Sequence, residues 1–146
     1  MNEDLKKATE IFEQGGYTCV AVKNGRSAVF RETGVRPLLI LIDGGDSMAG
    51  CCAADKIVGR AAAFLYCYMG ARAVYAETVS RGAVEIFENH GIDVRYKILT
   101  EQIVNRQGTG SCPMDTAVSG IASDGEDSPA KALEAIRAKL STLTID

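Results

Sequence analysis

A central strand and a central helix can be placed first, in the stretch from Gly50 to Gly70, GCCAADKIVGRAAAFLYCYMG. Its first five residues, 50–54, are small and apolar, which favours a short buried strand, and the polar pair Asp55-Lys56 follows. Residues 57–69 form a nearly continuous apolar run that is too long and too rich in alanine for a strand, so it predicts a buried helix. Because α/β proteins bind ligands at the carboxyl ends of their strands, a site is expected at this junction.

The composition fits a soluble protein with one hydrophobic core. The chain has 146 residues, of which 47% are hydrophobic, and a formal net charge of −3. This length predicts a single domain over residues 1–146, and no basic surface is indicated, so nucleic acid is not an expected partner. The N-terminus lacks a secretory signal, and no apolar run of about 18 residues occurs, so we expect a cytoplasmic protein without a membrane partner.

The cysteines predict neither a disulfide framework nor a metal site. The chain has five cysteines and one histidine, His90, and no CxxC pair. An odd number of cysteines in a chain of intracellular appearance favours reduced thiols. Cys51 and Cys52 are adjacent in the predicted strand and would point to opposite faces, so they do not suit a shared metal ion.

Before the central stretch, the sequence predicts a helix, a hairpin and a second helix. Two runs rich in β-forming residues flank Asn24-Gly25, the dipeptide that a type I′ hairpin turn prefers. Pro37 suits the first turn of the second helix. The two helices are expected over 2–14 and 34–43, and the two hairpin strands over 17–23 and 26–31.

After the central stretch, strands and helices alternate. Strands are expected over 71–77 and 93–99, and helices over 80–89, 113–121 and 129–143, the last after an acidic linker at 123–128. In 93–99 apolar residues alternate with Arg95 and Lys97, which suits a strand with one wet face near a sheet edge. The whole order predicts an α/β fold, a mixed sheet with helices on both faces and an extra C-terminal helix.

Five segments together resemble a known family. They are GVRPLL, ADKIVGRAAA, VYAETVS, GIDVRY and NRQGTGSCPMD, and the resemblance covers about residues 17–118. The family consists of short bacterial proteins of unknown function and has a cytidine-deaminase-like fold. It implies a three-layer mixed sheet with a ββαβαβαβ core, which agrees with the order of elements predicted above.

The zinc motifs of true deaminases are absent. Those enzymes carry H-x-E at the first core helix and P-C-x-x-C at the second. In this chain Arg36 and Pro37 stand at the first position, and Asp55, Lys56 and Gly59 at the second. The resemblance therefore implies the fold without zinc, without another cofactor and without hydrolytic deamination.

Asp55-Lys56 has two explanations if it lies at a helix start. Asp55 would be an ordinary N-cap that accepts a hydrogen bond from an early helical N–H. Lys56 is harder to explain, because a cation in the first turn opposes the helix dipole. Beside free N–H groups it would form a phosphate or carboxylate site, and when desolvated it would be a nucleophile, so both residues are also catalytic candidates.

Cys112-Pro113 predicts a second helix start, with Pro113 in the first turn and Cys112 as N-cap. A helix N-terminus favours the thiolate, which makes Cys112 a candidate nucleophile. Asp115 would oppose thiolate formation, and Arg106 would counter it if the loop folds back. The alternative is a loop cysteine without a chemical role.

We therefore expect a protein that binds a small anionic ligand at the N-terminus of the central helix. Besides Asp55 and Lys56, the expected binding residues are Arg36, Gly59, Asn105 and Arg106, the last two in the loop 105–112 that ends at Cys112. An enzyme that uses Cys112 or Lys56 as nucleophile is one alternative. A regulatory or assembly module that acts through its surface is another, and a homodimer would follow only by analogy with the fold.

Overall fold

The computed structural model describes residues 2–44, 48–105 and 107–143. These ranges contain six helices and five strands. In chain order they are α1 (Glu3–Glu13), β1 (Cys19–Lys23), β2 (Arg26–Phe30), α2 (Arg36–Asp43), β3 (Cys52–Val58), α3 (Arg60–Met69), β4 (Ala73–Ser80), α4 (Arg81–Asn89), β5 (Asp93–Thr100), α5 (Pro113–Ala117) and α6 (Ser128–Leu143). From β1 to β5 this is the ββαβαβαβ order that the resemblance implied.

The strands form one mixed sheet in the order β2-β1-β3-β4-β5. β1 pairs antiparallel with both β2 and β3, whereas β3, β4 and β5 are parallel. The carboxyl ends of these three parallel strands therefore meet at one end of the sheet, where the helices α3 and α4 begin.

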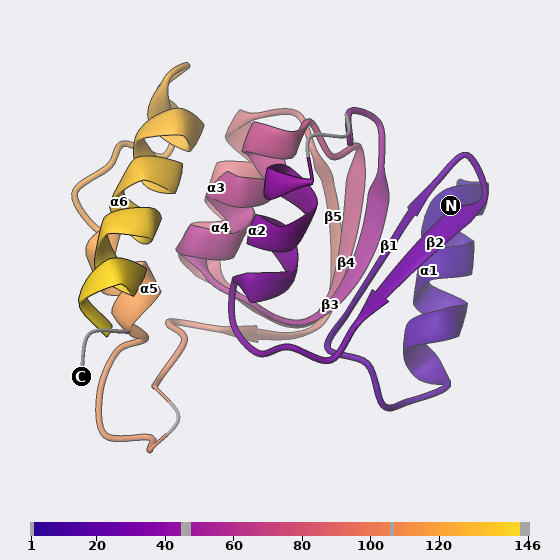
Figure 1. Ribbon diagram of the computed structural model, residues 1–146, viewed down its shortest axis with the longest axis horizontal. Helices are drawn as coiled ribbons and strands as arrows, with labels where there is room; N and C mark the ends of the chain where they lie inside the picture. Colours follow the sequence, from indigo (N-terminus) through magenta and orange to yellow (C-terminus); the bar gives the residue numbers. More distant parts are fainter. Residues whose placement is uncertain (1, 45–47, 106, 144–146) are drawn as a thin grey trace.

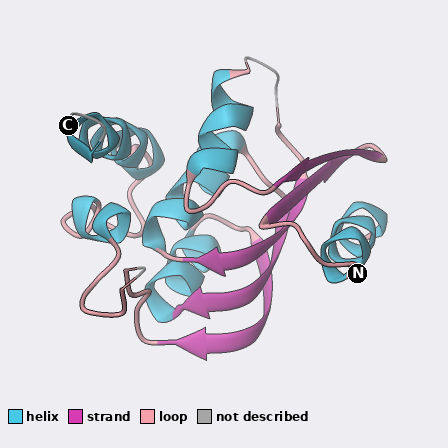
Figure 2. Cartoon of the chain, turned by 60° about the horizontal axis from the view of Figure 1, so that its bottom comes forward, coloured by secondary structure: helices cyan, strands magenta, loops and turns pink. Residues whose placement is uncertain are grey.

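Helices cover both faces of the sheet (Figures 1 and 2). α1 packs on one face against β1 and β3, and α2, α3 and α4 lie on the other. α6 and α5 pack against the outer side of α3, so that this helix lies between the sheet and a further layer of helix. The expected mixed sheet with helices on both faces is confirmed.

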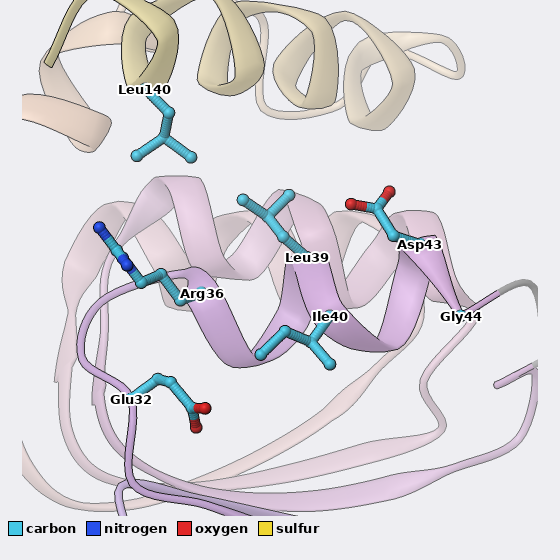
Figure 3. A pocket seen from close by; sticks show the side chains of 7 residues that line it. All are labelled: Glu32, Arg36, Leu39, Ile40, Asp43, Gly44 and Leu140. Atoms are coloured by element: carbon cyan, nitrogen blue, oxygen red, sulfur yellow. The ribbon is translucent and has the colours of Figure 1, made fainter. Parts of the chain in front are cut away.

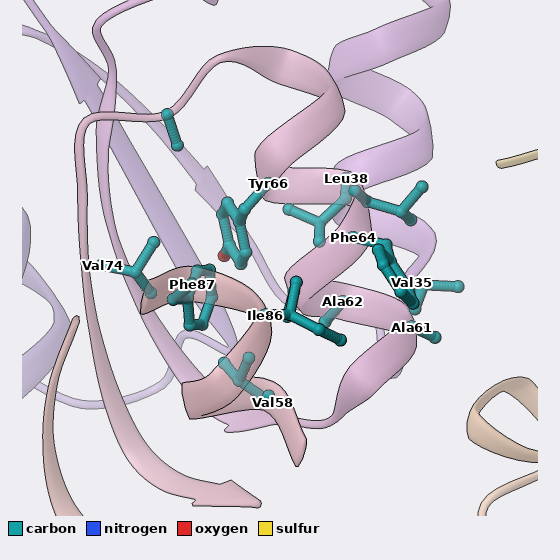
Figure 4. Packing of buried hydrophobic residues seen from close by; sticks show 14 of the residues in the cluster. Val35, Leu38, Val58, Ala61, Ala62, Phe64, Tyr66, Val74, Ile86 and Phe87 are labelled. Atoms are coloured by element: carbon teal, nitrogen blue, oxygen red, sulfur yellow. The ribbon is translucent and has the colours of Figure 1, made fainter. Parts of the chain in front are cut away.

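The position of α3 explains why its sequence is apolar on every side. Phe64, Leu65 and Tyr66 are consecutive, and all three are fully buried. Tyr66 packs beside Phe87 of α4, with ring centroids 6.2 Å apart (Figure 4). A helix that is hydrophobic all round has to be covered on most sides, and here the sheet, α2, α4 and α6 cover it, while Tyr68 stays 47% exposed.

The hairpin turn is also confirmed. Asn24 has φ +51° and Gly25 φ +81°, as a type I′ turn requires at both central positions. The turn sets the register in which Val20 lies opposite Val29 and Lys23 opposite Arg26.

The predicted boundary between the central strand and the central helix is wrong. β3 continues through the polar pair to Val58, Gly59 is the N-cap, and α3 begins only at Arg60. The strand continues because its neighbours bind this segment: the Lys56 N–H donates to the Thr18 carbonyl at 3.0 Å, and Ile57 and Val58 pair with β4. Asp55 and Lys56 are therefore strand residues and not the first residues of a helix.

Two other boundaries differ from the prediction by three or more residues. β4 extends three residues further, to Ser80, and α5 ends at Ala117 instead of Ile121. β5 is an edge strand, as expected, but its apolar face is partly open, with Tyr96 44% and Ile98 50% exposed. The C-terminal ends of β4 and α5 depend on which segments contact them in the folded chain.

Candidate functional site

A cavity of about 360 Å³ lies at the carboxyl end of β4, beside the first residues of α3 and α4. The remaining walls come from the segment that follows β5 and from α5 with the turn after it. Most of the residues that line it carry a polar side chain, although much of the surface they present is formed by carbon atoms: Arg60, Ser80, Gly82, Glu101, Gln102, Ile103, Ser111, Asp115, Thr116 and Ser119. This is the end of the sheet at which α/β proteins bind ligands.

Asp115 caps the N-terminus of α3 although it belongs to α5. Its carboxylate accepts a hydrogen bond of 2.9 Å from the Ala61 N–H and another from the Arg60 N–H. Burial raises the pKa of Asp115, and these hydrogen bonds and the Arg60 charge partly offset that effect. The anion expected at the start of the central helix is thus supplied by the chain itself.

Gly59 makes this contact sterically possible. A Cβ at Gly59 would lie 2.0 Å from Oδ2 of Asp115 and 2.7 Å from its Cγ, which no real atom tolerates. The φ of Gly59 is −101°, an angle open to any residue, so glycine is needed here for space and not for backbone freedom. The predicted binding residue Gly59 therefore lies at the edge of the site, against Asp115.

Arg60 is held in place by three contacts. It donates from Nη2 to the Ile121 carbonyl at 2.7 Å, and its guanidinium carbon lies 5.5 Å from the centroid of the Phe64 ring. Gly82 leaves room for the side chain, since a Cβ there would lie 2.9 Å from Cγ of Arg60. The Nε–H of Arg60 is buried and has no hydrogen-bond partner among the residues that the structure describes.

The sequence analysis missed Arg60. The signal was present in ADKIVGRAAA, where a glycine and an arginine precede an apolar helix. Because the helix start was placed three residues too early, this arginine was assigned to the helix interior. With the boundary at Gly59, Arg60 occupies the first turn, beside the Asp115 carboxylate.

The hydroxyl groups of the cavity have defined roles. Ser80 is the N-cap of α4 and accepts a hydrogen bond of 3.2 Å from the Ala83 N–H, so its own O–H is free to donate. Ser111 donates to Oε1 of Gln102 at 3.3 Å, and Ser119 donates to the Thr116 carbonyl at 2.8 Å. The cavity therefore offers both donors and acceptors to a polar molecule.

Asp55 and Lys56 lie apart from this lining. Asp55 is 6% exposed and accepts a hydrogen bond of 2.6 Å from the Tyr66 hydroxyl, on the side of β3 that faces α3. Lys56 is exposed on β3. The N-cap role considered for Asp55 is wrong, because Gly59 holds that position.

Arg36 lines a different hollow (Figure 3). It lies in the first turn of α2, and the groove of about 680 Å³ between α2 and α6 also includes Leu39, Ile40 and Leu140. Arg36 is thus not among the residues that line the cavity at Arg60 and Asp115.

The loop that ends at Cys112 is organised by its own hydrogen bonds. Nδ2 of Asn105 donates to Oγ1 of Thr109 at 3.2 Å, and the Thr109 N–H donates to Oδ1 of Asn105 at 3.0 Å. Asn105 therefore shapes the loop, and Arg106 lies outside the described residues. Cys112 is the N-cap of α5, as predicted, and is half-buried, but that helix has only five residues.

The described residues contain neither a group of side chains that could bind a metal ion nor a helix that could span a membrane. No group of three or more His, Cys, Asp or Glu side chains among them is placed to hold a metal ion. Within the same ranges, no helix is both long and apolar enough to cross a membrane.

The fold is that of an α/β protein with a mixed five-stranded sheet and a cavity at the carboxyl end of β4. The chain belongs to the family described as a domain of unknown function, DUF1893 (TM1506), whose model matches residues 7–140. It is similar to the crystal structure of a DUF1893 family protein (TM1506) from Thermotoga maritima, at 26% sequence identity and a TM-score of 0.79, over 97% of this chain and 92% of that chain.

A second similarity is remote. A diaminohydroxyphosphoribosylaminopyrimidine deaminase/5-amino-6-(5-phosphoribosylamino)uracil reductase from Thermotoga maritima matches at 21% identity and a TM-score of 0.43, over 65% of this chain and 35% of that chain. A likeness of this size supports no inference about activity. The search of curated proteins found no match.

Proposed function

We propose that the chain binds a small polar molecule in the cavity between Arg60 and Asp115. The observations that carry this proposal are that Arg60 lines the cavity and that its buried Nε–H has no acceptor among the described residues. A buried donor without a partner costs free energy on the order of 1–3 kcal/mol, so a ligand that supplies an acceptor there gains affinity from it. The cavity volume, about 360 Å³, is near the lower end of ligand sites.

The charges of the lining restrict the class of ligand. Arg60 calls for an acceptor such as a carboxylate or an amide carbonyl, whereas Asp115 disfavours a second negative group. The charge of Glu101, the other carboxylate of the lining, is paired with Arg81. The helix N–H groups that would attract a phosphate are already bonded to Asp115. The ligand is therefore a molecule with a single acidic or carbonyl group and with hydrogen-bond donors, a narrower class than the anion expected from the sequence.

The enzyme alternative has less support. Neither Cys112 nor Lys56 belongs to the lining of the cavity, so neither is placed to attack a molecule bound beside Arg60. A regulatory or assembly role through the surface would instead leave the cavity without a ligand. Both alternatives make different predictions in the experiment that follows.

Amide NMR with simple probes tests the proposal. Formate, acetate, lactate and acetamide, each titrated into the folded protein at millimolar concentration, should shift amides at 60–63, 80–83 and 111–119. Arg60→Gln, which removes the Nε donor, should lower the affinity of the best probe at least tenfold, and Arg60→Lys should not restore it. The matched control is Arg137→Gln, since Arg137 is exposed and pairs with Asp43 on the surface.

Two results would count against binding at this cavity. One is the absence of local shifts with every probe, which would favour the surface alternative. The other is an equal affinity of wild type and Arg60→Gln for the probe, which would place binding elsewhere. A chemical change in a probe that requires Cys112 or Lys56 would revive the enzyme alternative.

A further inference from the structure

Three side chains form a polar cluster inside the hydrophobic core, and the proposed function does not use them. They are Asp55 of β3, Tyr66 of α3 and Cys19 of β1, which we call the Asp55 cluster. Their exposed fractions are 6%, 0% and 1%. The Tyr66 hydroxyl donates to Oδ2 of Asp55 at 2.6 Å, and Sγ of Cys19 lies 3.4 Å from the same hydroxyl oxygen.

The cluster joins the central helix to the middle of the sheet. Cys19 and Asp55 lie directly opposite each other in the β1–β3 pairing, and on the other side Asp55 lies beside Ala76 of β4. Tyr66 reaches them from α3, where its ring also packs beside Phe87 (Figure 4). The hydroxyl of Tyr66 is therefore the polar link between α3 and two strands.

Among the described residues, no cation balances a charge on Asp55. From β1 it is faced by the Cys19 thiol, from α3 by the Tyr66 phenol, and from β4 by Ala76, which does not titrate. Within the described part of the chain, the carboxylate receives hydrogen bonds from Tyr66 and from the N–H groups of Ile57 and Lys56, and the Lys56 N–H is shared with the Thr18 carbonyl. Burial raises the pKa of Asp55 to about 7, and these hydrogen bonds lower it only in part.

The protonation state of Asp55 determines which group donates in the two hydrogen bonds of the cluster. Tyr66 has one hydroxyl proton, so when it donates to an ionised Asp55, Cys19 must be the donor to Tyr66. A neutral Asp55 can instead donate to Tyr66, which is then free to donate to the sulfur of Cys19. The cluster therefore has two arrangements with the same heavy atoms, and they differ by one buried negative charge.

We propose that the Asp55 cluster makes the packing of α3 on the sheet sensitive to protons. The helix is held most firmly while Asp55 is neutral, and more loosely once Asp55 is ionised inside the core. The physical reason is that a carboxylate without a cation gains hydration when the contact between Tyr66 and the sheet opens. This inference is independent of any ligand in the Arg60 cavity.

Hydrogen exchange of the α3 amides measures the opening directly. In the opened state Asp55 ionises near its ordinary pKa of about 3.9. The measured quantity is the ratio of the opening equilibrium constant in the wild type to that in Asp55→Asn. This ratio should increase up to ~10-fold per pH unit between pH ~4 and ~7 and then level off. Rates are corrected for the intrinsic pH dependence of exchange. Cys19→Ala keeps the carboxyl group and should keep the slope.

Parallel pH curves for wild type and Asp55→Asn would overturn the proposal. A second measurement needs no folded variant: the carboxyl ¹³C signal of Asp55 in the wild-type protein should titrate with a midpoint near neutral pH. A midpoint below about 5, close to an unperturbed aspartate, would overturn the proposal even if Asp55→Asn failed to fold.

Discussion

The contact between Gly59 and Asp115 allows a quantitative test of how the site is assembled. In Gly59→Ala the new Cβ would overlap with all three atoms of the Asp115 carboxylate, at 2.0, 2.7 and 2.7 Å, so no small adjustment can keep the group in place. The carboxylate must then leave the N-H groups of Arg60 and Ala61. Hydrogen bonds to a charged group contribute about 1.5–3 kcal/mol, and a charge at a helix N-terminus a further 0.3–1 kcal/mol or so.

We therefore expect Gly59→Ala to lower the free energy of unfolding by about 2–4 kcal/mol, and Asp115→Ala by a similar amount. The two effects should not add, because both variants lose the same interaction. In the Asp115→Ala background, Gly59→Ala should cost only the ordinary difference between glycine and alanine at an N-cap, roughly 0.5–1 kcal/mol. Urea unfolding at pH 7, followed by circular dichroism, gives all four values.

The matched control is Gly120→Ala, where a Cβ meets no atom within 4 Å, and we expect a change of less than about 0.5 kcal/mol. The reasoning is refuted if Gly59→Ala costs as much in the Asp115→Ala background as in the wild type. In that case the loss would come from the backbone at Gly59 and not from the displaced carboxylate.

Two further predictions concern the hairpin and the thiols. Gly25→Ala should lower the free energy of unfolding in urea by about 1–2 kcal/mol. Gly25 has φ +81° and an added Cβ would meet no described atom within 4 Å, so we expect the whole loss to come from backbone strain. A loss equal to that of Gly120→Ala would contradict this. Iodoacetamide at pH 8 should label Cys112 before Cys67, since burial raises the pKa of Cys67 to about 12 and the thiolate is the reactive form. Peptide mass spectrometry measures the order of labelling. Faster labelling of Cys67 would contradict the prediction.

Asp115 has a consequence for any ligand of the cavity. It occupies the α3 N-terminus that would otherwise attract an external anion, and it brings a negative charge to the cavity wall. Asp115 satisfies the helix N–H groups and also interacts with the Arg60 charge, whereas the Nε–H of Arg60 has no acceptor among the described residues. The ligand that we propose would have to match both charges, which disfavours a phosphate.

Local chemistry in the sequence was sufficient for much of the fold. Asn24-Gly25 specified the hairpin because few dipeptides accept two positive φ angles in succession. Cys112-Pro113 marked the start of α5 because proline fits only the first turn of a helix. The order of strands and helices followed from the hydrophobic pattern.

The tertiary structure decided the identity of the site residues. β3 runs through Asp55 and Lys56 because Thr18 and β4 bind its backbone, and neither partner can be read from the polar pair itself. The capping carboxylate at α3 comes from Asp115, 54 residues away from Ala61 in the chain. The cap of α3, the burial of the Asp55 carboxyl group and the buried Nε–H of Arg60 depend on contacts between distant segments, and such contacts exist only once the chain has folded.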